Sequence, residues 1–233
     1  MAAGRDAASQ RAMTEDPALP PLTLADDGLE TSLRARLGPR APICGVDEAG
    51  RGPWAGPVFA AAVSFEAGTA PEGLADSKML TAERRTELAA SIRDCAVWAV
   101  AFASVEEIDR LGLGRAADLA MVRAVTGLAS APTFALVDGN RTPRGLGCEA
   151  EAVVQGDVRS VSVAAASILA KTTRDLLMED LAADTPGYGW ERNRGYGTPE
   201  HVEALKRLGV TQHHRRSFKP IHNILLEGRS ITD

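Results

Sequence analysis

The stretch Ile43–Val58, which reads ICGVDEAGRGPWAGPV, constrains the fold of this chain more than any other. A short apolar run ends in two adjacent carboxylates, Asp47 and Glu48, and Gly-Arg-Gly follows at residues 50–52. Glycine adopts backbone angles that are closed to other residues, so the run is predicted to be a strand that rises to a tight turn. Paired carboxylates at a strand end suit Mg²⁺, which prefers oxygen ligands and keeps waters for substrate phosphates. The stretch therefore indicates phosphodiester chemistry.

Two familiar phosphate-binding loops are excluded by their spacing. The Walker A pattern requires Lys followed by Ser or Thr, and this chain has Arg51 followed by Gly52 at those positions. The dinucleotide fingerprint requires a glycine at position 55, whereas the next glycine is Gly56 and Pro53 interrupts the turn. Because an Asp-Glu pair before glycines is most often a solvated turn, the functional interpretation depends on acids elsewhere in the chain.

The length and composition predict one main domain. The 233 residues can bury one substantial core, so we expect residues 41–233 to form this domain behind an N-terminal extension, residues 1–40, that is mostly a disordered tail. No stretch approaches the roughly 18–20 apolar residues of a membrane span, so no membrane contact is expected. The cysteines Cys44, Cys95 and Cys148 lack metal-type spacing and are expected to be reduced in a cytoplasmic protein.

The charge is distributed unevenly along the chain. Its formal net charge is −5, which by itself argues mildly against binding to nucleic acid. The segment from Arg192 to Pro220, however, contains seven Lys or Arg residues and only two acidic residues. This segment is interpreted either as a solvated helix face or as a surface that contacts phosphates.

Strands and helices are predicted to alternate along the chain. Residues 43–48 and 57–64 are expected to form a β-hairpin, and a helix is expected to begin near residue 81 with Thr81 as its cap. The other expected strands are 96–103, which is apolar and predicted to be buried, 133–137 and 152–154. The other expected helices are 27–37, 116–128, 161–181 and 199–208.

Acidic residues recur in one structural situation. Asp47 and Glu48, Asp138 and Asp157 each follow a short apolar run, in or beside a glycine turn. If the strands share one sheet, their ends can converge into a cluster of four carboxylates. Like charges held together raise one another's pKa unless a cation neutralises them, so such a cluster predicts a metal site.

At this point the sequence resembles ribonuclease HII, the prokaryotic type 2 ribonuclease H, over nearly all of residues 41–220. The resemblance implies an α/β, RNase H-like fold: a mixed five-stranded sheet flanked by helices, with a small C-terminal helical portion that binds substrate from about residue 184. The segments that carry it are GVDEAGRGPWAGPV, LADSKMLTAERR, ALVDGN, VVQGDVRSVSVAAASILAKTTRD, NRGYGTPEHVEAL and HHRRSFKP.

The resemblance also implies roles for individual residues. The four carboxylates, Asp47, Glu48, Asp138 and Asp157, match the family's catalytic metal ligands, which hold two Mg²⁺ or Mn²⁺ ions. The loop Gly50, Arg51 and Gly52 matches the element that reads the ribonucleotide 2′-OH, and Tyr196 matches the tyrosine that stacks on the following sugar. Four further residues border the active site in the family and either contact phosphates or pack on a helix surface: Lys78, Ser167, Lys171 and Arg174.

The activity implied by the resemblance is metal-dependent cleavage of RNA in duplexes. The expected substrates are RNA–DNA hybrids and single ribonucleotides embedded in duplex DNA, cut on the 5′ side to leave 3′-OH and 5′-phosphate ends. This chemistry serves ribonucleotide excision repair and RNA primer removal, and the protein is expected to act as a monomer. Two alternatives remain: another RNase H-like metal-dependent nuclease, and a catalytically silent nucleic-acid-binding module. Trp54, Arg194 and Gly112 depart from residues common in the family, and none belongs to the acidic cluster.

Overall fold

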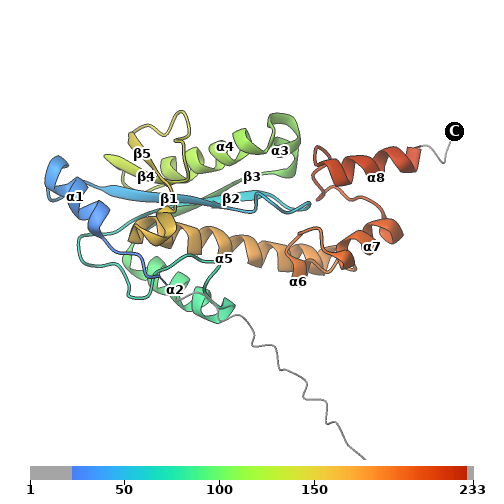
Figure 1. The fold of residues 1–233 in the computed structure, drawn as a ribbon, viewed down its shortest axis with the longest axis horizontal. Helices are drawn as coiled ribbons and strands as arrows, with labels where there is room; N and C mark the ends of the chain where they lie inside the picture. The colour runs from blue at the N-terminus through green and yellow to red at the C-terminus, as the bar shows by residue number, and fades with distance from the viewer. Residues whose placement is uncertain (1–22, 230–233) are drawn as a thin grey trace, which may run out of the picture.

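A computed structural model describes residues 23–229 of the chain, which form a five-stranded sheet between two layers of helices (Figure 1). The strand order is β3-β2-β1-β4-β5, with β2 antiparallel to both neighbours and β4 parallel to both of its own. The sheet is therefore mixed, as predicted. The strands are β1 (Ile43–Ala49), β2 (Val58–Ser64), β3 (Val97–Ala103), β4 (Phe134–Asp138) and β5 (Glu149–Val153).

The two faces of the sheet build two separate cores. Alternate residues of a strand point to opposite faces. In β2, Val58, Ala60 and Ala62 accordingly join the core beneath α4, whereas Ala61 and Val63 join the core beneath α5 and α2. The helices around the sheet are α1 (Gly28–Leu37), α2 (Ala82–Cys95), α3 (Val105–Leu111), α4 (Leu113–Thr126) and α5 (Val161–Asp184).

The C-terminal portion packs on the far end of α5. It comprises α6 (Trp190–Asn193), α7 (Pro199–Leu208) and α8 (Lys219–Arg229), and its own core surrounds the fully buried Trp190. This portion begins where α5 ends, close to the predicted boundary near residue 184. Within residues 23–229, no helix is long and apolar enough to cross a membrane.

Several predicted elements are confirmed. The hairpin formed by β1 and β2 is present, α2 begins after Thr81, and the Thr81 hydroxyl accepts a hydrogen bond from the backbone N–H of Arg84. The helix expected over residues 27–37 is α1. The tail predicted before it falls mostly on residues 1–22, which lie outside the described residues.

The prediction that residues 96–103 form a buried strand is wrong in its burial. β3 lies at the edge of the sheet, and Trp98 and Phe102 are 37% and 50% exposed. The apolar run does form a strand. Because β3 pairs with β2 at the edge of the sheet, part of its apolar surface stays in contact with solvent.

A buried carboxylate fastens α1 to the start of α5. Glu30 is 2% exposed, and its Oε1 accepts hydrogen bonds from the hydroxyls of Ser160 and Ser162, each at 2.6 Å, and from the Ser162 backbone N–H at 3.0 Å. A negative charge at a helix N-terminus is favourable, because the first backbone N–H groups there lack helical partners. Glu30 therefore stabilises the position of α5 beneath the sheet.

Replacing Glu30 tests this contact. We expect Glu30→Ala to lower the free energy of unfolding by about 2 kcal/mol, because the two serine hydroxyls and a helix N–H lose a charged acceptor. Urea unfolding would measure the change, with Glu66→Ala, at an exposed loop carboxylate, as the control. Equal stabilities of the two variants would contradict the assignment.

Candidate active site

Three of the predicted carboxylates meet where β1 and β4 end. The parallel register pairs Val46 with Val137, so the next residues, Asp47 and Asp138, are neighbours on the α5 face of the sheet. Asp138 Oδ1 accepts a hydrogen bond of 2.8 Å from the backbone N–H of Gly156. This hydrogen bond places the short 3₁₀ helix η1 (Gly156–Val158), which contains Asp157, next to the end of β4.

Glu48 leaves the same strand on the other face. Adjacent strand residues point in opposite directions, and Glu48 forms an ion pair of 3.1 Å with Arg51 rather than joining the α5 side. Asp47 is 6% exposed and accepts hydrogen bonds from the Glu48 backbone N–H, at 2.7 Å, and from the Ser167 side chain. The two carboxylates therefore flank the end of one strand.

The cluster carries strong like-charge repulsion. Burial, followed by the charges of Glu48 and Asp138, raises the pKa of Asp47 well above its usual value. Burial, followed by the charges of Asp76 and Asp138, raises the pKa of Asp157 to about 6. Both effects oppose the ionised form, so the negative charge of the cluster is incompletely compensated by the protein.

Asp76 is a member of the cluster that the sequence reasoning missed. Its charge adds to the burial that raises the pKa of Asp157, and its Oδ1 accepts from the backbone N–H of Lys78 at 2.9 Å. The one available signal was its place in the segment LADSK, from which only Lys78 was selected. The Lys78 side chain is 78% exposed. Its partial burial lowers the pKa, but the charges of the carboxylates, led by Asp76, outweigh this effect, so the pKa of Lys78 is raised.

The donor set of this cluster fits a hard divalent cation. All of its side-chain donors are carboxylate oxygens, the ligands that Mg²⁺ and Mn²⁺ take, and the raised pKa values mark charge that a cation would neutralise. In the part of the chain that the structure describes, no three acidic, His or Cys side chains form a ready-made metal site.

The loop at residues 50–52 lies beside this cluster and against Tyr196. A methyl group built on Gly52 would lie 3.1 Å from Tyr196 Cε1, so the loop and the tyrosine ring are in close approach. Tyr196 is 46% exposed, and the Arg51 side chain is 49% exposed. Both groups are accessible to a ligand that reaches the carboxylates.

A buried arginine holds the loop from behind. The Arg215 guanidinium is inaccessible to solvent and donates hydrogen bonds to the carbonyl oxygens of Gly50 at 2.6 Å, Arg51 at 3.1 Å and Gly56 at 2.8 Å. Arg174, which is 1% exposed, donates to the carbonyls of Ala55 and Pro57 at 3.1 and 3.2 Å. Sequence reasoning missed Arg215, although its segment HHRRSFKP belongs to the resemblance.

Two buried histidines hold the backbone of Tyr196. His201 Nδ1 lies 2.9 Å from the Tyr196 carbonyl oxygen, which only accepts, so Nδ1 is the donor and Nε2 the acceptor. Nε2 then accepts from Trp190 Nε1 at 3.2 Å and from His214 Nε2 at 3.0 Å. Burial, followed by the charge of His201, lowers the pKa of His214 to about 3, so both rings are neutral near pH 7.

The remaining predicted residues fall on α5. Ser167 is buried, and its hydroxyl lies 2.7 Å from that of Ser77. Lys171 forms an ion pair of 2.7 Å with Asp175, and Arg174 faces the loop described above. Much of the basic segment 192–220 is likewise engaged: Arg192 pairs with Glu191 and Glu200, Arg194 with Glu179, and Lys206 with Glu203.

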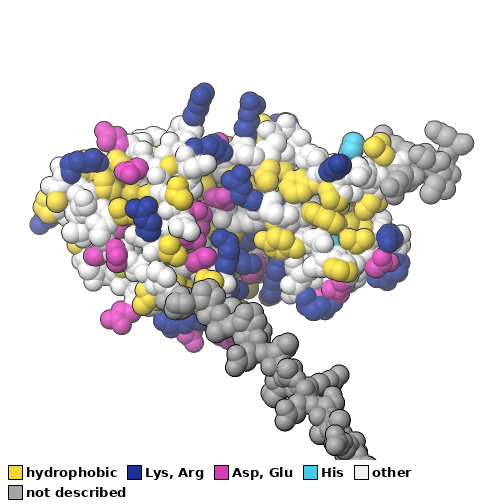
Figure 2. Space-filling model, in the orientation of Figure 1, with side chains coloured by type: hydrophobic (Ala, Val, Ile, Leu, Met, Phe, Trp, Pro, Cys, Tyr) yellow, Lys and Arg dark blue, Asp and Glu magenta, His cyan; other side chains and the backbone are white. Residues whose placement is uncertain are grey.

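The surface over this region is of mixed charge (Figure 2). Asp and Glu side chains lie among Lys and Arg across the middle of this face, and hydrophobic side chains gather toward the C-terminal helices. A polyanion would meet basic side chains beside the carboxylates on this face.

Comparison with known proteins identifies one family. A family model described as Ribonuclease HII matches residues 44–221. The ribonuclease HII of Ruegeria pomeroyi is 59% identical over 206 residues, which cover 88% of this chain and 87% of that protein.

Solved structures of similar proteins share the fold. The ribonuclease H2 from Pyrococcus horikoshii matches with a TM-score of 0.70 and 26% identity, covering 81% of this chain and 99% of that one. Bst-RNase HIII, solved in complex with Mn²⁺, matches with a TM-score of 0.64 and 20% identity, covering 82% of this chain and 71% of that one. The predicted RNase H-like fold is confirmed.

The raised pKa of Asp157 predicts a pH-dependent cost in stability. A folded pKa of about 6 against an ordinary 3.8 means that the folded state binds the proton more tightly, so stability is lost as the pH rises from about 4 to about 6. In EDTA at pH 7 we therefore expect Asp157→Asn to raise the free energy of unfolding by about 1 kcal/mol. At pH 4 the gain should shrink toward zero.

Urea unfolding at the two pH values would measure this effect, with Glu66→Gln as an exposed control. A variant that is less stable than the parent at pH 7 would show that Asp157 is compensated in the folded protein.

Proposed function

The chain belongs to the ribonuclease HII family of endoribonucleases, and we propose that it cleaves the RNA strand of RNA–DNA hybrids and single ribonucleotides embedded in duplex DNA. The cut falls on the 5′ side of the ribonucleotide and leaves 3′-OH and 5′-phosphate ends. The observation that carries this proposal is the close approach of the Gly50–Gly52 loop and Tyr196 beside the carboxylate cluster. The loop and Tyr196, which are proposed to contact the sugars, and the carboxylates, which are proposed to bind the cations, can then contact the same ligand.

In this proposal Asp47, Glu48, Asp138 and Asp157 hold two divalent cations, Mg²⁺ or Mn²⁺. When bound, the cations lower the pKa of the attacking water and neutralise charge on the leaving oxygen. The raised pKa of Asp47 supports this assignment, because burial and then the charges of Glu48 and Asp138 raise it, and a bound cation would favour the ionised form. Asp76 keeps Lys78 at the rim of the cluster, where the ammonium group can meet the substrate backbone.

Recognition of the ribonucleotide falls to the loop and Tyr196. The 2′-OH is the group that distinguishes RNA from DNA at one nucleotide, and backbone groups of Gly50–Gly52 together with Arg51 are the partners offered beside the cluster. Tyr196 stacks on the following sugar and so favours an RNA-to-DNA junction. Ser167 supports Asp47, and Arg174 acts on the substrate through the loop that it holds.

This activity suits the removal of ribonucleotides from DNA. Ribonucleotide excision repair and RNA primer removal both require a cut at the junction of RNA and DNA. In this proposal the protein is a cytoplasmic monomer.

The direct test uses a labelled DNA duplex with one ribonucleotide. We expect cleavage on the 5′ side of the ribonucleotide with Mg²⁺ or Mn²⁺ and none with EDTA. Asp47→Asn should reduce the rate by at least about 100-fold while largely sparing affinity for the duplex, because a ligand is lost and the basic surface is unchanged. Retained turnover by this variant would contradict the four-carboxylate assignment. If the wild-type chain binds this duplex and an RNA–DNA hybrid but cuts neither, it is a catalytically silent binding module.

Two variants separate the roles of Tyr196. Tyr196→Ala should weaken cleavage of the embedded ribonucleotide by about 1–3 kcal/mol in kcat/KM, with a smaller loss of affinity for plain duplex DNA. Tyr196→Phe keeps the ring and serves as the matched control, with cleavage near that of the parent. Equal losses of cleavage and of plain-duplex affinity in Tyr196→Ala would identify a purely structural tyrosine.

A further inference from the structure

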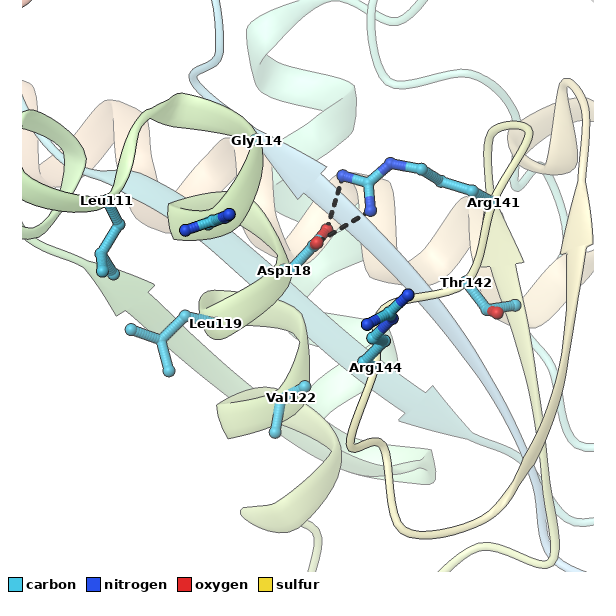
Figure 3. Close-up of a pocket in the computed structure, with 9 residues that line it drawn as sticks. Leu111, Gly114, Asp118, Leu119, Val122, Arg141, Thr142 and Arg144 are labelled. Atoms are coloured by element: carbon cyan, nitrogen blue, oxygen red, sulfur yellow. Dashed lines mark hydrogen bonds and ion pairs between the residues drawn. The ribbon is translucent and has the colours of Figure 1, made fainter.

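A hollow lined by arginines lies between α4 and the loop that joins β4 to β5 (Figure 3). Its volume is about 890 Å³. Leu111, Leu119 and Val122 form an apolar wall on the helical side, and Arg141 and Arg144 reach toward it from the loop. Arg115, in the first turn of α4, is the third arginine of the lining.

The charges in this hollow are unbalanced. Arg141 forms a two-pronged ion pair with Asp118, with both N–O distances at 2.8 Å. Within residues 23–229, Arg115 and Arg144 have no hydrogen-bond or ion-pair partner for their side chains. The hollow therefore keeps two positive charges that the described protein does not neutralise.

The hollow lies on the α4 face of the sheet, the face to which Glu48 points. Arg141 follows Asp138 by three residues, after β4 has ended. The Asp118 partner raises the pKa of Arg141, and the charge of Glu48 raises it further, so Arg141 lies within electrostatic reach of the strand end that carries Glu48. A duplex held at the carboxylates extends past this strand end.

We propose that this hollow is a second binding site for the substrate, in which Arg115 and Arg144 bind backbone phosphates of the duplex outside the cleavage position. The proposal rests on the proposed function, since it takes the duplex to lie across the carboxylates. Guanidinium groups match phosphate oxygens in geometry and keep their charge at any relevant pH. Asp118 holds the Arg141 fork in place, and the apolar wall suits the faces of deoxyribose rings.

Salt dependence of binding tests the proposal. The probe is a fluorescein-labelled duplex with one ribonucleotide, titrated in EDTA so that it remains intact, over a series of NaCl concentrations. The slope of log K against log[NaCl] is negative, and each phosphate contact that is lost reduces its magnitude by about one, so Arg115→Gln/Arg144→Gln should reduce the magnitude by about two. The single variant Arg144→Gln should lower it by about half as much.

Arg40→Gln is the matched control. Arg40 is exposed, has no side-chain partner among the described residues, and precedes β1 at the end opposite Asp47. The slope of this variant should equal that of the parent. Equal slopes for the parent and the double variant would overturn the proposal.

A scan with neutral phosphates locates the contact. Methylphosphonate is placed at one position at a time in either strand, and affinity is measured for the parent and for the double variant. We expect one or two positions at which the change weakens binding by the parent several-fold but leaves the double variant unaffected. No such position in either strand would overturn the proposal.

The same duplex separates this proposal from the proposed function. If the parent cleaves it with Mn²⁺ while the double variant keeps the parental slope, the hollow is not a substrate site and the proposed function stands. If the magnitude of the slope falls as expected while the parent cleaves neither this duplex nor an RNA–DNA hybrid, the hollow binds nucleic acid and the proposed function fails.

Discussion

Two buried guanidinium groups determine the shape of the β1–β2 connection, and the proposed substrate-reading loop depends on them. Arg215 and Arg174 come from the C-terminal part of the chain and donate to carbonyl oxygens between residues 50 and 57. Burial lowers the pKa of Arg215 to about 9 and that of Arg174 to about 10. A buried charge is tolerated only when its donors are satisfied, and here backbone carbonyls satisfy them. Removing Arg215 would take the guanidinium donor from the carbonyls of Gly50, Arg51 and Gly56, and removing Arg174 would take it from the carbonyl of Ala55.

The carboxylate cluster carries the opposite kind of constraint. Asp47 and Asp157 are buried beside other acids, and burial followed by the charges of those acids raises the pKa of both, so the fold opposes their ionised forms at this point. A hydrophobic or amide side chain at either position would remove this cost. Sites that bind cations commonly have such a destabilised arrangement, since the free energy lost in folding is recovered when the ion binds. Lys78 offsets part of the charge from an exposed position, which leaves the interior of the cluster open to a cation.

The parts of the structure that could be predicted from sequence are those that local patterns determine. Glycine spacing located the β1–β2 turn, a threonine cap located the start of α2, and apolar runs ending in acids located Asp138 and Asp157. The contribution of Asp76 depends on a loop that tertiary packing brings to η1. The roles of Arg215 and the exposure of β3 likewise depend on which segments become neighbours, and no local pattern encodes that.

The position of the Gly50–Gly52 loop relative to Tyr196 depends on the dipeptide His214-Arg215. His214 acts through His201, which donates to the Tyr196 carbonyl, whereas the adjacent Arg215 donates to the Gly50 carbonyl. Both histidine rings are neutral near pH 7, so this chain of hydrogen bonds has a single arrangement of protons. Successive residues of the backbone therefore hold the two halves of the proposed junction reader, and the backbone N–H of Trp54 joins them directly by donating to the Gly195 carbonyl at 2.8 Å. The reader is therefore preorganised by the C-terminal segment rather than by the loop itself, whose glycines supply close approach but no rigidity.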